Sequence, residues 1–231
     1  MPSAAVPDYL PSKRGFPFPN WYPPGTPVLE LPTPFGTIPI GNANGGLCGG
    51  MAFASLDLFT FNRPPPPAPE PPVFRYLCHR LIDSFNLPFG VLKYYDWQRR
   101  PLATRSFAGV TVQDGLTRLT VEVEWPKIRA LLDAEQPAPL GLVKAHSFRP
   151  IELGKNHQVL AYAYDLDDES GELALKVYDP KYACDDGVTL TLNVYVPMAG
   201  RPVTHSREGE SVRGVFLTEY RVPASAPEFG V

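Results

Sequence analysis

Residues 157–179 read HQVLAYAYDLDDESGELALKVYD, and two apolar runs in this segment flank an acidic turn. The runs 157–164 and 173–178 are rich in Val, Leu and Tyr, which favour strands. Residues 165–172 carry the Asp, Ser and Gly typical of turns. The acids and the glycine lack the spacing of an EF-hand calcium loop. The segment therefore predicts a β-hairpin with a solvated loop at 165–172.

Two polar residues occupy matching ends of this hairpin. If the hairpin is symmetric about residues 168–169, residue 164 faces residue 172 and His157 faces Asp179. Alternation places both residues at the ends of apolar, core-facing stripes. Opposed residues in a sheet have Cβ atoms about 4.5 to 5.5 Å apart, within reach of a hydrogen bond. The pair either orients an imidazole for proton transfer or caps the hairpin structurally.

The remaining elements separate into a helical half and a sheet half. Apolar runs bounded by turn residues predict further strands at 140–145, 188–196 and 212–222. Helical spacing and proline positions predict helices at 48–61, 73–85, 88–100 and 124–132. Helices before strands indicate an α+β fold. We expect one domain over 41–222, with a helical part at about 41–135 and a sheet part at about 136–222.

The chain ends differ in composition from this domain. Residues 1–40 combine many of the 29 prolines with several aromatic side chains. Proline favours extended chain, while so many aromatics are unusual in a disordered segment. We expect residues 1–40 to form an ordered arm wrapped over the domain and residues 223–231 to form a tail.

A cysteine lies between glycine pairs at the start of the first predicted helix. Cys48 stands in Gly45-Gly46-Leu47-Cys48-Gly49-Gly50, followed by the apolar run 51–59. Unpaired N–H groups of a first helical turn favour a thiolate, the reactive form of cysteine. The glycines would let a substrate approach the backbone. The segment fits a helix-terminal nucleophile or a small buried packing residue.

Composition excludes several classes of function. The 231 residues carry a net charge of −3 without a basic stripe, which argues against nucleic-acid binding. Three cysteines show the spacing of neither a disulfide framework nor a zinc site, so we expect reduced thiols and no metal or other cofactor. Neither a signal peptide nor a membrane-length apolar run is present. We expect a soluble cytoplasmic protein that does not bind membranes, with non-classical export as an effector the alternative.

The other cysteines and histidines have no predicted catalytic role. Cys78 and His79 are adjacent on a helix and cannot chelate one metal from one face, so packing or exposure is expected. Cys184 lies in a predicted turn. His146 and His205 lack an acidic partner at strand register and are expected at the surface.

A cysteine that opens a buried helix, a later histidine on a strand and an acid ending the next strand resemble the papain-like cysteine peptidase superfamily. The matching segments are Gly46–Gly50 around Cys48, Asn156–Leu160 around His157 and Val177–Pro180 around Asp179. The resemblance covers about residues 40–222. It implies a cleft between two lobes, with Cys48 on the helical side and His157 and Asp179 on the sheet side.

The resemblance also implies an oxyanion-binding residue. In the family a glutamine stands six residues before the nucleophile, and here that position is Asn42, with Asn44 as a second candidate. Asn42 is equally suited to be a turn residue, and the backbone N–H of Cys48 could be the other donor. Gly49 replaces the aromatic residue that follows the nucleophile in papain, and Asp179 replaces the orienting asparagine.

Three functions are compatible with these residues. The first is a thiol hydrolase, a peptidase that cleaves a peptide, protein or amide substrate through a Cys48 acyl-enzyme, with His157 as base and Asp179 as orienting acid. The second is an acyltransferase or transglutaminase-like enzyme, in which an amine resolves the same acyl-enzyme. The third is a papain-like binding module without activity.

Overall fold

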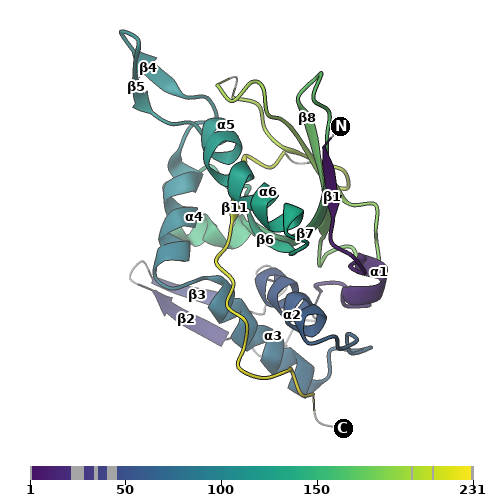
Figure 1. Ribbon diagram of the computed structural model, residues 1–231. Coiled ribbons are helices and arrows are strands. Elements are labelled where there is room, and N and C mark those ends of the chain that lie inside the picture. Colours follow the sequence, from purple (N-terminus) through teal and green to yellow (C-terminus); the bar gives the residue numbers. More distant parts are fainter. Residues whose placement is uncertain are drawn as a thin grey trace.

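The chain folds as a mixture of helices and strands, the latter mostly in one antiparallel sheet (Figure 1). A computed structural model describes residues 2–21, 29–33, 36–40, 46–198, 200–209 and 211–229. The helices are α1 (Pro11–Arg14), α2 (Cys48–Thr60), α3 (Pro71–Ser84), α4 (Phe89–Arg99), α5 (Leu116–Arg118) and α6 (Trp125–Asp133), with a π-helical turn η1 (Leu119–Glu124) and a 3-10 helix η2 (Pro150–Lys155). The strands are β1 (Ser3–Ala5), β2 (Leu29–Thr33), β3 (Gly36–Ile40), β4 (Arg105–Phe107), β5 (Val110–Gln113), β6 (Ala138–Val143), β7 (His157–Leu166), β8 (Glu172–Tyr178), β9 (Thr189–Asn193), β10 (Thr204–His205) and β11 (Gly214–Leu217).

Strand β7 is the centre of the main sheet. The strand order is β10-β9-β8-β7-β6-β11, and every neighbouring pair is antiparallel. One edge of β7 pairs with β8. The other edge pairs with β6 over residues 157–161 and with β1 over residues 163–165. Because β7 is buried along almost its whole length, it is apolar at nearly every position rather than at alternate ones.

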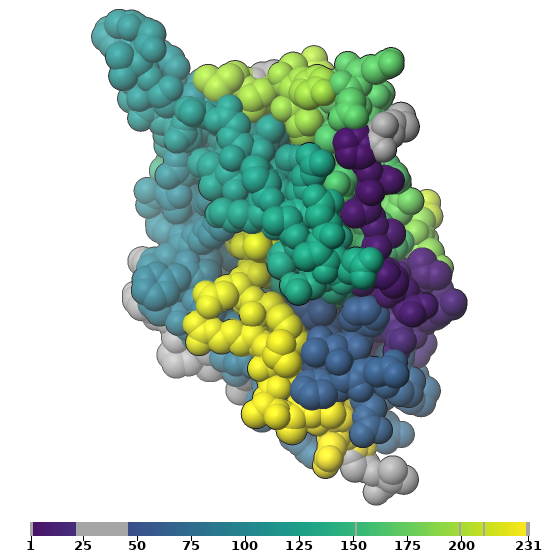
Figure 2. Space-filling model, in the orientation of Figure 1, coloured from purple at the N-terminus to yellow at the C-terminus, as the bar shows by residue number. Residues whose placement is uncertain are grey.

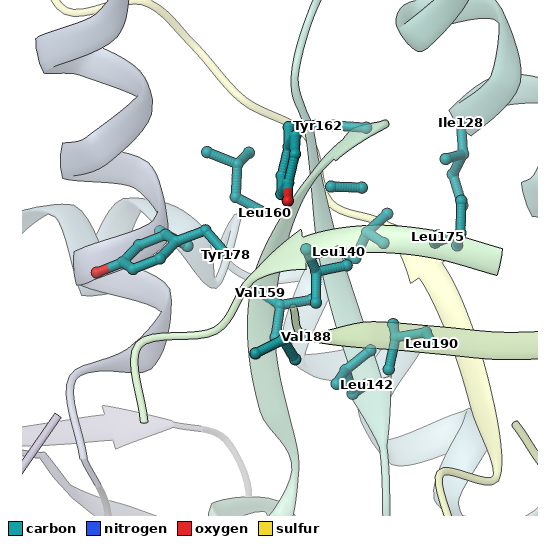
Figure 3. Packing of buried hydrophobic residues seen from close by; sticks show 14 of the residues in the cluster. Ile128, Leu140, Leu142, Val159, Leu160, Tyr162, Leu175, Tyr178, Val188 and Leu190 are labelled. Atoms are coloured by element: carbon teal, nitrogen blue, oxygen red, sulfur yellow. The ribbon is translucent and has the colours of Figure 1, made fainter. Parts of the chain in front are cut away.

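The core joins this sheet to the helices. Helix α2 packs against α3 on one side and β7 on the other, while α6 packs against β1, β6, β7 and β11. Figure 3 shows Ile128 of α6 next to Leu175 of β8, with further buried side chains of the neighbouring strands beside them. Burying this continuous cluster is the main stabilising contribution in the fold. The α+β prediction is confirmed, although strand β1 at the start of the chain also belongs to the main sheet.

The predicted elements are present with shifted ends. The four predicted helices correspond to α2, α3, α4 and α6, and the five predicted strands to β6, β7, β8, β9 and β11. The strand predicted at 212–222 is limited to β11, after which Thr218 bonds to the carbonyl of Pro139. Sequence patterns missed the short elements β1, α1, β10 and η1 and the hairpins β2–β3 and β4–β5. Most of these elements have between two and four residues, too few for a clear apolar period, and Pro32 and Pro39 interrupt the strand patterns of β2 and β3.

The N-terminal arm is ordered over residues 2–21 and packs on the domain. Strand β1 joins the sheet, and Val6, Tyr9 and Phe16 are buried. The Tyr9 hydroxyl is hydrogen-bonded to Ser55 of α2 at 2.6 Å. This part of the arm was predicted to wrap over the body, and it does. The boundaries at 40, 135 and 222 stay predictions.

The register of the β7–β8 hairpin differs from the predicted one. Tyr164 pairs with Leu175 instead of residue 172. A β-bulge between residues 161 and 163 separates this pair from the pair of Leu160 with Tyr178. The turn is displaced because the Asp167 carboxylate accepts hydrogen bonds from the Glu169 amide and the Ser170 hydroxyl, while Gly171 takes a positive φ of 73°. The prediction that His157 lies directly opposite Asp179 is therefore wrong. The turn is shorter than the predicted loop 165–172, because Asp165 and Leu166 belong to β7 and Glu172 belongs to β8, and its residues 168–170 are exposed as predicted.

In the part of the chain that the structure describes, no helix is both long enough and apolar enough to cross a membrane.

Candidate active site

The first residue of α2 is Cys48, and α2 is buried from Cys48 through Leu58. No side chain caps its N-terminus. The amide of Leu47 instead donates to the side-chain oxygen of Asn20 at 2.7 Å. The sulfur therefore lies at the positive end of a buried helix, where a thiolate is favoured over a thiol.

The glycines after Cys48 serve helix packing. A Cβ atom at Gly49 would lie 2.3 Å from the Ser84 hydroxyl, and one at Gly50 would lie 2.0 Å from the carbonyl oxygen of Leu77. Both Ser84 and Leu77 belong to α3, so these glycines let the two helices approach closely. The prediction that they open the backbone to a substrate is wrong for Gly49 and Gly50.

His157 begins β7 and connects Cys48 to an acid. Its Nε2 atom is 2.7 Å from Oδ1 of Asp179, the first residue after β8. Cys48 contributes with Asp179 to raising the pKa of His157, so the imidazole lies beside the sulfur. Because Nε2 is engaged by Asp179, Nδ1 is the nitrogen left to face Cys48. The start of β7 is also held from behind, where the Tyr94 hydroxyl donates to the His157 carbonyl at 3.2 Å.

The His157–Asp179 contact forms although the two residues are not directly opposed. Continuing the ladder from Leu160 and Tyr178 places Asp179 level with Val159. His157 is two residues from Val159 and on the same face. Diagonal neighbours of this kind are within reach of long side chains. The predicted pair is thus present through a diagonal contact, because a two-residue shift preserves the face of the sheet.

The Asp179 carboxylate is completely buried and accepts three hydrogen bonds. Oδ1 receives His157 and the amide of Lys181 at 2.9 Å, and Oδ2 receives Nε2 of His205 at 3.0 Å. Burial alone would raise the pKa of Asp179, but the charge and hydrogen bond of His157 and the bonds from His205 and Lys181 hold it well below its usual range. The group is therefore an anchored anion.

His205 is the residue that sequence reasoning missed. It was predicted to be at the surface, but its side chain is fully buried in β10, which pairs with β9. Its Nδ1 atom accepts the amide of Arg207 at 3.2 Å, so the proton of a neutral ring is on Nε2 and points at Asp179. A two-residue edge strand has no apolar period that could reveal this placement. The other surface prediction, His146, is confirmed.

The thiol and imidazole influence each other strongly. Burial raises the pKa of Cys48, but the charge and hydrogen bond of His157 and a hydrogen bond from the Gln158 backbone outweigh it, so the pKa is lowered overall. Burial lowers the pKa of His157, and Asp179 and Cys48 raise it above its ordinary value. Both shifts favour a thiolate–imidazolium pair.

Asn20 links the two segments that present these groups. Its side-chain oxygen accepts a hydrogen bond from the backbone amide of Leu47, the residue before Cys48. The backbone amide of Asn20 donates to the carbonyl of Pro180, the residue after Asp179, at 2.7 Å. A Cβ atom at Gly46, whose φ is 51°, would lie 2.5 Å from the Asn20 amide nitrogen. The N-terminal arm thereby joins the helical and sheet sides of the site.

The candidate oxyanion residues Asn42 and Asn44 lie outside the described residues. Cys48 and His157 are 9% and 5% exposed. Two pockets formed by described residues, of about 340 and 570 Å³, contain neither of these two residues nor Asp179. A cleft at Cys48 stays a prediction.

The remaining cysteines match their predicted settings. All three cysteines are free, with Cys78 buried and Cys184 exposed in a turn. His79, beside Cys78, is exposed. Among the described residues, no group of three or more His, Cys, Asp or Glu side chains could hold a metal ion.

Comparisons with known protein families, with curated proteins and with solved structures found no match to this chain.

Proposed function

We propose that this chain is a papain-like cysteine hydrolase that cleaves peptide or amide bonds. Cys48 is the nucleophile, His157 carries the proton and Asp179 orients His157. The observation that carries the proposal is one buried imidazole that is hydrogen-bonded to an anchored carboxylate and lowers the pKa of a cysteine at the start of a helix. The papain-like assignment is supported by the positions of these groups, with the cysteine on α2 and the other two on β7 and after β8.

The reaction begins from the thiolate–imidazolium pair. The thiolate attacks the carbonyl carbon, a C–S bond forms and the negative charge moves to the carbonyl oxygen. The backbone N–H of Cys48 stabilises this charge, and Asn42 or Asn44 supplies the second donor. The C–N bond then breaks as Nδ1 of His157 gives its proton to the leaving amine. This leaves an acyl-enzyme and a neutral imidazole.

Water completes the cycle. Neutral His157 removes a proton from water while the remaining hydroxide adds to the acyl carbon. Collapse of the second intermediate breaks the C–S bond, releases the acid and regenerates the thiolate–imidazolium pair. Asp179 stays ionised throughout, because its three hydrogen bonds stabilise the carboxylate form.

A small activated ester tests the proposal without knowledge of the natural substrate. With p-nitrophenyl acetate, we expect a burst of p-nitrophenol equal to the amount of protein and acetylation of Cys48 detectable by peptide mass mapping. Acetylation spread equally over Cys48, Cys78 and Cys184 would contradict the proposal. Added glycinamide distinguishes hydrolysis from acyl transfer, since a hydrolase releases acetate and a transferase forms the amide.

A further inference from the structure

A second candidate site is formed by residues that follow the Cys48 segment in the sequence. It lies where the β4–β5 hairpin leaves the body of the protein near the end of α4. The hairpin projects as a separate lobe in Figures 1 and 2. A pocket of about 340 Å³ at this position is lined by three arginines, one carboxylate and three further polar or aromatic side chains, namely Arg99, Arg100, Arg105, Asp96, Gln113, His146 and Phe148, together with Pro101. This volume is at the lower end of the range for small-ligand sites.

Most of the positive charge in this pocket is not neutralised. Arg100 pairs with Asp96 at 2.7 Å. Arg99 stacks over the rings of Tyr95 and Phe148, at 5.0 and 5.8 Å from their centroids. Among the described residues, Arg99 and Arg105 have no carboxylate within ion-pair distance. Stacking occupies the faces of the Arg99 guanidinium and leaves its N–H edge available for a ligand.

A buried cation strengthens the positive potential from behind. Arg213 is only 9% exposed, and its guanidinium donates to the carbonyls of Ala145 at 3.1 Å and Arg100 at 2.8 Å. Carbonyl groups satisfy its hydrogen bonds without cancelling its charge. The field of Arg213, followed by burial and Arg105, lowers the pKa of His146, so this charge acts at the pocket wall.

We propose that this pocket binds a phosphoryl group. Two guanidinium groups without carboxylate partners, a buried cation behind them and an amide side chain at Gln113 match the charge and the acceptor oxygens of a phosphate. The phosphoryl group belongs to a soluble metabolite or to a lipid headgroup. The proposal is independent of the hydrolase proposal, because no residue of the Cys48–His157–Asp179 set lines the pocket.

His146 is the reporter that tests this site. Its imidazole resonances are followed by NMR across a pH titration, with and without inorganic pyrophosphate, at an ionic strength held constant with chloride. The variant His146→Asn assigns the signal. A bound anion offsets the arginine field, so we expect pyrophosphate to raise the pKa of His146. An unchanged pKa at 10 mM pyrophosphate, about the highest useful concentration for a weak specific site, would overturn the proposal.

Charge-neutralising variants separate a built site from general attraction. Arg99→Gln and Arg105→Gln should each weaken pyrophosphate binding, measured by calorimetry, by about tenfold. Arg75→Gln is the matched control, since Arg75 is exposed on α3 and does not line the pocket. Equal weakening in all three variants would also overturn the proposal.

Vesicles identify the source of the phosphoryl group. Phosphatidylcholine vesicles with and without 5% phosphatidylinositol bisphosphate are sedimented with the protein. Sedimentation that requires the anionic lipid and is lost in Arg105→Gln identifies a lipid headgroup. Pyrophosphate binding without sedimentation identifies a soluble ligand. The absence of both would contradict the site.

Discussion

Helices α2 and α3 pack against each other, and each carries a cysteine that is 9% exposed. Burial raises the pKa of both thiols. For Cys78 nothing offsets burial, so the pKa of this thiol is raised overall. For Cys48 the interactions with His157 and the Gln158 backbone outweigh burial, and its pKa is lowered.

The difference shows that burial alone does not determine the chemistry of a cysteine. Cys78 lies within a helix, where its neighbours are apolar side chains of the core. Cys48 starts α2 and lies beside the first residue of β7, the imidazole of His157, which is hydrogen-bonded to the Asp179 carboxylate. The difference in pKa between the two thiols therefore comes from His157, which β7 places next to Cys48 and not next to Cys78.

The largest contrast is expected when each thiol is replaced. Cys48→Ser should lower the acylation rate with p-nitrophenyl acetate by about 10³-fold or more, because a hydroxyl is a far weaker nucleophile at neutral pH. Cys78→Ser should leave the rate unchanged. The burst assay checks both variants, and a comparable loss in Cys78→Ser would remove the distinction between the two sites.

The second-largest effect is expected when the Asp179 carboxylate is replaced, which should lower the reactivity of Cys48. In Asp179→Asn the acylation rate should fall by about 10²-fold, since an uncharged amide stabilises the imidazolium less. The charge of Asp179 raises the pKa of His157, so its removal lowers that pKa. The alkaline limb of the pH–rate profile should therefore move to lower pH. A profile that keeps its alkaline limb would show that Asp179 does not set the protonation of His157.

The close contact between the helices can be broken at a glycine. In Gly50→Ala the new Cβ would lie 2.0 Å from a backbone oxygen of α3, so the free energy of unfolding should fall by about 1–3 kcal/mol. Gly154→Ala is the control, because no atom lies within 4 Å of its added Cβ. Urea unfolding measures both. Equal stability of the two variants would restore the interpretation of Gly50 as an opening for substrate.

His205 should have the smallest effect on chemistry. His205→Ala removes the hydrogen bond to Oδ2 of Asp179, and the acylation rate should fall by about threefold to tenfold as the carboxylate loses one anchor. His205→Gln can restore a donor and should recover part of the rate. The exposed His146 serves as control in His146→Ala. A rate unaffected in His205→Ala would limit His205 to a structural role.

Much of the fold follows from local patterns in the sequence. Helix α2 is predictable because an apolar run ends at Pro64, and β7 and β8 are predictable because two apolar runs flank a turn. The register is not, since it depends on how Asp167 and Gly171 close the turn and on the bulge near Tyr162. The predicted His157–Asp179 pair nevertheless forms, because the shift at this end of the hairpin is even.

The rest of the site depends on contacts between distant segments. His205 reaches Asp179 only because the short strand β10 joins the sheet beside β9. Asn20 reaches Leu47 because the arm folds back over the domain. The approach of α3 that requires Gly49 and Gly50 is likewise a tertiary contact. Neither apolar periodicity nor motif spacing carries such information.

His157 activates Cys48 in the proposed mechanism, and pH-dependent alkylation of the individual thiols measures this activation. Iodoacetamide modification is mapped to each cysteine by mass spectrometry in the native protein and in His157→Ala, with the exposed Cys184 showing that the reagent is active. We expect Cys48 to react below pH 7 while Cys78 lags, and we expect His157→Ala to slow the reaction of Cys48 markedly. Equal reactivity of Cys48 and Cys78, or a Cys48 rate unchanged in His157→Ala, would contradict this activation.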